Sequence, residues 1–225
     1  MSEKFLVVGM GVFGRNIAAK LTQNGAEVVA VDSRMDLVEE VQEKVTYAAC
    51  LNSIDEKALK NLNPGEFDTG IVCIGANFEA NVLTSVLLKQ NGVKQVITRA
   101  SDPTHIRILE AVGIDQVITP EIEASEKLVN SLVHRNILDC SFVGLDTAVA
   151  KINLPPSFAG KTLKDAGFRA KYGVNVISIY RPEKNKDGKT TGEKVANKNP
   201  SADTVLNEGD ILLVIGDISE LQKIT

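Results

Sequence analysis

Residues 5–14 read Phe-Leu-Val-Val-Gly-Met-Gly-Val-Phe-Gly, an apolar run that passes directly into a glycine-rich loop. The loop has the spacing GxGxxG, in which Gly9 permits a tight turn, Gly11 lets the backbone approach a pyrophosphate and Gly14 lets the next helix pack on the sheet. The free amides and the positive end of a helix that begins near Val12 attract phosphates. This stretch predicts the strand, the phosphate-binding loop and the helix that open a Rossmann-type domain.

A second apolar run, residues 28–31, ends at Asp32, which follows Gly14 by 18 residues. A carboxylate in this position accepts hydrogen bonds from ribose hydroxyls and repels a 2′-phosphate, which disfavours NADP. A glycine motif alone is a weak signal, and a glycine-rich turn without a ligand is the alternative. The position of Asp32 favours the nucleotide site.

Apolar runs alternate with segments of helical spacing over residues 1–136. Strands that are apolar on both faces are typical of a parallel sheet covered by helices on each side. We therefore expect residues 1–136 to form an α/β, Rossmann-type doubly wound domain. The expected strands are 5–8, 28–31, 45–50, 71–74, 95–98 and 116–119.

The pattern changes after Asn136, and residues 137–225 are expected to form a small α+β subdomain. Apolar and polar residues alternate over 141–154, which predicts one strand. Residues 184–199 are rich in Lys, Asn and Gly, and we expect an exposed hairpin loop there. No Gly/Ser linker marks the boundary, so the helix expected at 121–133 is a candidate connection.

The residues expected to bind the nucleotide lie in the glycine loop or where a parallel strand ends, because the carboxyl ends of such strands face one crevice. Turn and helix-capping chemistry is the alternative for the strand ends, and Asn77 would be a natural cap. The expected site is Gly9, Met10, Gly11, Val12, Phe13, Gly14, Asp32, Ser33, Asn52, Ser53, Ile74, Gly75, Ala76, Asn77 and Arg99.

The composition argues against several classes of protein. The net charge is −4, aromatic residues make up 4% and Trp is absent, so neither a basic nucleic-acid footprint nor a base-stacking platform is expected. The three cysteines lack metal-ligand spacing, which fits a reducing, cytosolic location. No signal peptide or apolar run of about 20 residues is found, so a membrane role would require a partner.

A dehydrogenase needs an acid–base group beside its nicotinamide. The only histidines are His105 and His134, and surface or interface roles are expected for both. Tyr180 and Lys184 have the spacing YxxxK, but Pro182 excludes the helix that would place them on one face. The residues favour binding over catalysis, and an NAD-dependent oxidoreductase remains the competing hypothesis.

Four motifs in the first half resemble those of RCK domains, the regulators of potassium conductance. They are VGMGVFG at 8–14, AVD at 30–32, VCIGAN at 72–77 and GIDQVITPE at 113–121. RAKYGVNV at 169–176 and LNEGDILLVIG at 206–216 are similar to the companion C-terminal subdomain. The whole chain resembles the cytosolic regulatory subunits of Ktr/Trk potassium uptake systems.

The resemblance implies a non-enzymatic subunit that binds ATP/ADP or NAD(H) and gates a potassium-translocating membrane subunit. Such proteins pair into homodimers that assemble into octameric rings, and they sit in the cytoplasm, peripheral at the inner face of the cell membrane. ATP-regulated members resemble GxGRFG, whereas Val12 occupies the arginine position here. The loss of that phosphate contact weakens the case for ATP, and Arg15 either replaces it or lies on a solvated face. A stand-alone nucleotide sensor is a further alternative.

The resemblance also implies two further sites. Glu121 matches a position that binds a divalent cation at a dimer interface, although an acidic residue after Pro120 is also a good helix start. Arg169 and Asn175 match positions that contact cyclic di-AMP, although a surface arginine and a strand-edge asparagine are the alternative.

Two expected helices, 104–112 and 121–133, carry more apolar positions than one sheet face would bury. A helix that is apolar over more than one face usually packs against two surfaces. We therefore expect at least a dimer, and we expect charged substitutions at Leu109 or Val112 to disrupt it. Deeper burial within one subunit is the alternative.

Overall fold

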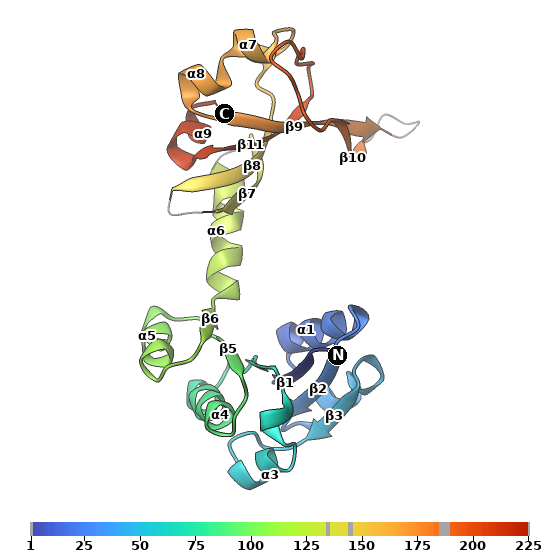
Figure 1. The fold of residues 1–225 in the computed structure, drawn as a ribbon, viewed down its shortest axis with the longest axis vertical. Coiled ribbons are helices and arrows are strands. Elements are labelled where there is room, and N and C mark those ends of the chain that lie inside the picture. Colours follow the sequence, from blue (N-terminus) through green and yellow to red (C-terminus); the bar gives the residue numbers. More distant parts are fainter. Residues whose placement is uncertain (1, 134–135, 144–145, 185–189, 225) are drawn as a thin grey trace. The chain divides into compact units, whose positions relative to one another are not determined.

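The computed structural model describes residues 2–133, 136–143, 146–184 and 190–224. The chain forms two compact units, Met1–Ile122 and Glu123–Thr225, each with its own sheet (Figure 1). The boundary expected after residue 136 stays a prediction.

The first unit is built on a six-stranded parallel sheet of order β3-β2-β1-β4-β5-β6. This order and the alternation with helices confirm the predicted doubly wound Rossmann-type fold. The strands are β1 (Lys4–Val8), β2 (Glu27–Asp32), β3 (Tyr47–Cys50), β4 (Thr69–Val72), β5 (Gln95–Arg99) and β6 (Gln116–Ile118). The helices are α1 (Val12–Gln23), α2 (Met35–Glu39), α3 (Glu56–Lys60), α4 (Phe78–Gln90), α5 (Pro103–Ala111) and α6 (Pro120–Val133), the last continuing into the second unit.

Two apolar clusters cover the faces of this sheet. One includes Leu59, Leu88 and Leu109 from the α3, α4 and α5 side, and the other includes Ala18 of α1 and Val41. Figure 1 shows α1 and the pair α4 and α5 on opposite sides of the strands. Burial of both faces explains why the strands are apolar throughout instead of alternating.

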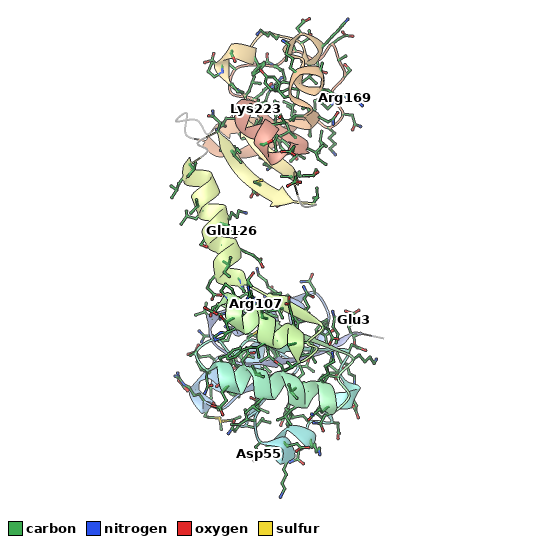
Figure 2. All side chains as sticks on the ribbon, turned by 90° about the vertical axis from the view of Figure 1, so that its left-hand side faces the viewer. Glu3, Asp55, Arg107, Glu126, Arg169 and Lys223 are labelled. Carbon is green, nitrogen blue, oxygen red and sulfur yellow. The ribbon has the colours of Figure 1, made fainter. Side chains whose placement is uncertain are left out.

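The second unit contains a five-stranded antiparallel sheet of order β10-β9-β11-β8-β7, which confirms the predicted α+β subdomain. Its strands are β7 (Ile137–Phe142), β8 (Thr147–Asn153), β9 (Asn175–Lys184), β10 (Thr190–Asn197) and β11 (Ile211–Asp217). Short helices α7 (Leu163–Ala166), α8 (Phe168–Tyr172) and α9 (Ile218–Ile224) complete it. Figure 2 shows the side chains of both units on the ribbon.

Two expectations about the second unit were wrong. The strand expected over 141–154 is divided between β7 and β8, which pair antiparallel with Cys140 opposite Ala150. The expected hairpin loop at 184–199 contains β10, in which Lys194 pairs with Arg181 of β9. Edge strands have one partner and are often polar, so a polar composition is a poor guide to their absence.

Among the described residues, none of the helices combines the length and apolar character required to cross a membrane.

Candidate functional site

A cavity of about 590 Å³ lies at the carboxyl ends of the parallel strands in the first unit. The chain leaves β1 for β2 on one side and reaches β4 on the other, so the cavity lies where the strand order reverses. Ligands of doubly wound proteins bind at this point.

The glycine loop forms one wall of the cavity. Gly9 adopts a φ of +96°, which favours glycine, and its amide donates to Val31 O at 2.8 Å. Gly14 lies where α1 passes over the loop, and a Cβ at this position would overlap the backbone oxygen of Gly9. Gly11 has open space around its Cα, because a Cβ added there would meet nothing within 4 Å. Two of the three glycines are therefore required by the fold, while Gly11 leaves room for a ligand.

Asp32, at the end of β2, is joined to the glycine loop. One carboxylate oxygen accepts the Met10 amide at 2.6 Å, and the other accepts the Arg34 amide at 2.9 Å. Each oxygen keeps a further lone pair for a donor such as a ribose hydroxyl. Asp32 thus fixes the loop and faces the cavity at the same time.

The ends of β3 and β4 combine binding surface with structural contacts. Ser53 lines the cavity, but its hydroxyl is buried against Thr84 at 2.7 Å. Asn77 caps α4 by accepting the Ala80 amide at 2.9 Å, as the capping alternative anticipated. Buried Asn81 donates to Ile74 O at 2.7 Å, and it thereby holds the loop that follows β4. The residues at these strand ends therefore line the cavity and also make capping or packing contacts, so the binding and the capping interpretations are compatible.

Arg99, at the end of β5, supplies a cation to the cavity. Its guanidinium carbon lies 5.7 Å from the centre of the Phe13 ring, and Nε donates to Glu121 Oε2 at 3.3 Å. The guanidinium also lies over Gly75, where a Cβ would come within 3.1 Å of Cζ.

Eleven of the fifteen predicted nucleotide-site residues line this cavity, and the other four lie in the glycine loop around it. The Met10 amide donates to the Asp32 carboxylate, and Gly14 packs closely against Gly9. The Phe13 ring faces the guanidinium of Arg99. Val12 is exposed and lines a neighbouring hollow beside Arg15. The lining residues are Gly9, Gly11, Asp32, Ser33, Asn52, Ser53, Ile74, Gly75, Ala76, Asn77 and Arg99.

Sequence reasoning missed six lining residues: Val8, Arg34, Leu37, Ile54, Cys73 and Ala80. Arg34 and Ile54 are next to predicted residues, so a wider window after each strand would have included them. Leu37 and Ala80 lie on helices, and neither the glycine spacing nor the ends of the strands predict which helical residues face the cavity. Burial raises the pKa of the Cys73 thiol to about 12, so it lines the cavity as a neutral group.

Arg15 lies outside the cavity lining and forms an ion pair with Glu40. In this arrangement its side chain is 28% exposed and lies beside Glu40 and Lys44, and a phosphate contact through Arg15 stays a prediction.

Glu121 pairs with Arg99 at the start of α6. In the part of the chain that the structure describes, no group of three or more His, Cys, Asp or Glu side chains is placed to hold a metal ion. The divalent cation at Glu121 therefore stays a prediction.

Arg169 and Asn175 lie on the wall of one surface pocket in the second unit, of about 410 Å³. The pocket is bounded by α7, α8 and the start of β9, with Ser201 on its rim. Arg169 is labelled on α8 in Figure 2. The two residues expected to contact cyclic di-AMP are thus brought together, and the ligand itself stays a prediction.

His105 lies outside the lining of the main cavity. His105 stacks on Phe78, with ring centroids 3.6 Å apart, and lines a smaller adjacent hollow. His134 lies outside the described residues.

The fold defines a Rossmann-type domain with a cavity at the reversal of strand order, followed by a small domain with an antiparallel sheet. The TrkA-N domain family matches residues 5–120, and the TrkA-C domain family matches residues 148–225. The chain therefore belongs to the RCK family of proteins that combine a TrkA-N and a TrkA-C domain, which confirms the resemblance stated from the motifs.

Named relatives agree with this assignment. The Ktr system potassium uptake protein C of Bacillus subtilis is 34% identical over 223 residues, covering 99% of this chain and 96% of that protein. The Ktr system potassium uptake protein A of the same organism is 28% identical over 222 residues, with 99% and 95% covered. The solved GsuK RCK domain has a TM-score of 0.64 at 19% identity. The match covers 100% of this chain and 48% of the GsuK chain.

Proposed function

We propose that this chain is a nucleotide-binding regulatory subunit of a potassium uptake system. The observation that carries the proposal is the cavity at the reversal of strand order, where the glycine loop and the Asp32 carboxylate meet. The family membership supplies the physiological setting, because the relatives covered over nearly their whole length are potassium uptake proteins.

We propose binding without catalysis. The titratable side chains along the cavity are Asp32, Arg34, Cys73 and Arg99. Asp32 accepts hydrogen bonds from two amides, and burial raises the pKa of Cys73 so far that little thiolate exists near neutral pH. None of these groups is suited to exchange a proton with the hydroxyl or carbonyl oxygen of a substrate. Steady turnover of NAD+ with a hydroxy acid, or of NADH with a keto acid, would support the oxidoreductase instead.

The ligand class that we propose is an adenine nucleotide, ATP/ADP or NAD(H). Asp32 suits a ribose with free hydroxyls, and Arg99 suits an anionic group at the other end of the cavity. The GsuK channel bound to NAD shares the fold, with a TM-score of 0.62 at 20% identity and 38% of that chain covered. Val12 cannot make the charged phosphate contact of an arginine, so NAD(H) and ADP remain candidates beside ATP.

We propose that the subunit acts in the cytoplasm, at the inner face of the membrane, through a potassium-translocating membrane subunit. A ligand can gate such a partner only if it binds two states of the assembly with different affinity. Potassium uptake into vesicles that contain the membrane subunit and this protein should therefore change with ATP, ADP or NADH. Potassium uptake that is the same with and without each of the three nucleotides, or that proceeds equally without this protein, would contradict the proposal. Failure to capture any such membrane subunit would leave the stand-alone sensor.

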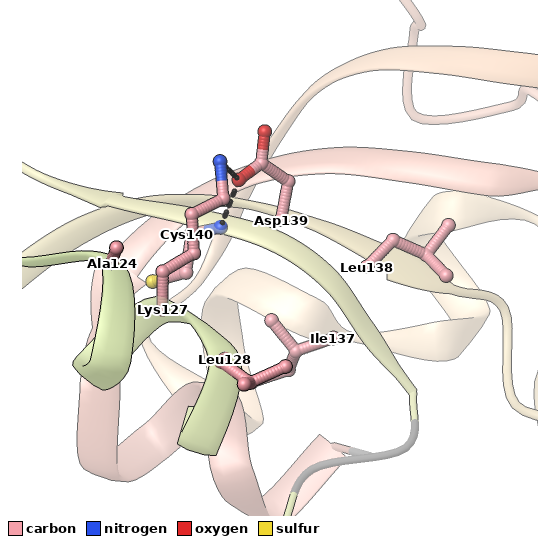
Figure 3. A pocket seen from close by; sticks show the side chains of 7 residues that line it. All are labelled: Ala124, Lys127, Leu128, Ile137, Leu138, Asp139 and Cys140. Atoms are coloured by element: carbon pink, nitrogen blue, oxygen red, sulfur yellow. Dashed lines mark hydrogen bonds and ion pairs between the residues drawn. The ribbon is translucent and has the colours of Figure 1, made fainter. Parts of the chain in front are cut away.

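We propose that the chain forms homodimers that assemble into an octameric ring. Leu132 and Val133 at the end of α6 are 68% and 66% exposed, which is costly for adjacent apolar side chains in water. A groove of about 310 Å³ lies between α6 and β7. Leu128 and Leu138 are among the residues that line it, and they are labelled in Figure 3. An apolar face of this kind fits the self-complementary patch of a two-fold dimer.

The proposed dimer is tested by Leu132→Asp, which should give a monomer at micromolar concentration because it places a charge in the apolar contact. Leu109, a position at which the sequence predicted a disruptive effect, is unsuitable because it is fully buried in the core of the first unit. Val112 is 44% exposed and remains suitable. Light scattering of the wild type and of Lys20→Asp, a charged change on the outer face of α1, provides the comparison. A monomeric wild type, with and without nucleotide, would refute the dimer and the ring.

Two further ligands are proposed on the family resemblance. A divalent cation at Glu121 would need additional oxygen ligands, which a second subunit or a phosphate could supply, because such ions take six or more. Cyclic di-AMP would use Arg169 for its phosphates and Asn175 for a base edge. Calorimetry with cyclic di-AMP should show binding that Arg169→Ala weakens, and no binding to the wild type would refute this site.

A further inference from the structure

Arg99 contacts both the nucleotide cavity and the first turn of α6. Its guanidinium reaches the nucleotide cavity over Gly75, and it forms an ion pair with Glu121 in the first turn of α6. Gly75 makes this position possible, since a side chain there would meet the guanidinium at 3.1 Å. The same cation therefore lies beside the proposed ligand and beside the helix that leads into the second unit.

The ion pair between Arg99 and Glu121 is weak enough for another anion to replace the Glu121 carboxylate. The Arg99 side chain is 21% exposed and the Glu121 side chain is 48% exposed, so water and salt screen their attraction. A phosphate carries more negative charge than a carboxylate and offers several acceptor oxygens to a guanidinium. A phosphate in the cavity is thus a strong competitor for Arg99.

We propose that Glu121 and an anionic group of the bound nucleotide compete for Arg99, so that a phosphate-bearing ligand releases the first turn of α6. This inference rests on the proposed nucleotide site. Ligands that share the adenosine part but differ in charge then act differently: adenosine fills the cavity and leaves the pair intact, whereas ATP breaks it. The start of α6 becomes the place where the charge of the ligand is sensed.

The test is the Glu121→Gln variant, titrated with ATP and with adenosine by calorimetry in EDTA, which removes any divalent cation. Loss of the competitor should raise the affinity for ATP about three- to fivefold and leave that for adenosine unchanged. In a protein that already carries Arg99→Gln, the Glu121→Gln substitution should leave the affinity for ATP unchanged. The matched control is Glu110→Gln, which removes one exposed carboxylate from α5 away from the cavity and should bind both ligands as the wild type does.

Hydrogen exchange supplies a second readout. ATP should speed the exchange of amides in the first turn of α6 in the wild type, and it should fail to do so in Arg99→Gln. An ATP affinity that is unchanged or lowered in Glu121→Gln, or an equal rise for adenosine, would overturn the competition. That result differs from a failure of the nucleotide site, in which the wild type would bind neither adenosine nor ATP and both proposals would fall.

Discussion

Gly14→Ala is expected to lower the free energy of unfolding of the first unit by about 3 kcal/mol. The added Cβ would overlap the backbone oxygen of Gly9 and would lie 3.1 Å from the Cys73 side chain. Alanine stabilises a helix relative to glycine by about 1 kcal/mol. The variant cannot realise this stabilisation, because α1 would have to move away from the glycine loop to make room for the methyl group. Urea unfolding followed by circular dichroism measures the change, and nucleotide binding should fall with it.

Gly11→Ala is the matched control for this prediction. Its Cβ would meet nothing within 4 Å, and Gly11 has an extended conformation, with φ −60° and ψ −179°, that any residue adopts. We expect unfolding within about 0.5 kcal/mol of the wild type but weaker nucleotide binding, because the methyl group occupies the space over which phosphates approach. Equal unfolding curves for Gly14→Ala and Gly11→Ala would contradict the packing argument, and full binding by Gly11→Ala would contradict the phosphate position.

Asp32→Ala is expected to weaken binding of the adenine nucleotide by about 2–4 kcal/mol, the value of two hydrogen bonds to a charged group. This corresponds to a roughly 30- to 700-fold loss of affinity. The Met10 and Arg34 amides also lose their acceptor, so the glycine loop should become less ordered. Calorimetry with ATP, ADP and NADH measures the loss.

Asp36→Ala provides the control for Asp32→Ala. Asp36 lies on α2 outside the cavity lining, and its hydrogen bond to Arg34 lowers the pKa of its carboxyl group. Removing it takes away a nearby negative charge but no proposed ligand contact, so affinity should stay close to that of the wild type. If Asp32→Ala binds as tightly as Asp36→Ala, the ribose contact is wrong.

The regular part of the first unit could be predicted because its signals are local. The glycine spacing at residues 9–14 and the acid at the end of β2 follow from the geometry of one strand–loop–helix unit. The carboxyl ends of β3, β4 and β5 then share one edge of the sheet, so the sequence order was enough to gather Asn52, Asn77 and Arg99.

The remaining features depend on contacts between residues far apart in the chain. The pairing of Arg99 with Glu121 and the burial of Ser53 against Thr84 arise only when loops and helices are packed. Leu109 has the same apolar character as exposed Val112, and only the rotation of α5 on the sheet separates core from surface. The division of residues 141–154 into β7 and β8 depends on antiparallel pairing, which the alternating pattern does not reveal.

The most direct test of the central claim is to identify the nucleotide that the purified protein retains, by mass spectrometry after denaturation, for the wild type and Asp32→Ala. We predict ATP, ADP or NAD(H) in near-stoichiometric amount with the wild type and little with Asp32→Ala. A wild type that carries no adenine nucleotide, and that takes up none when incubated with all of them before measurement, would contradict the nucleotide site.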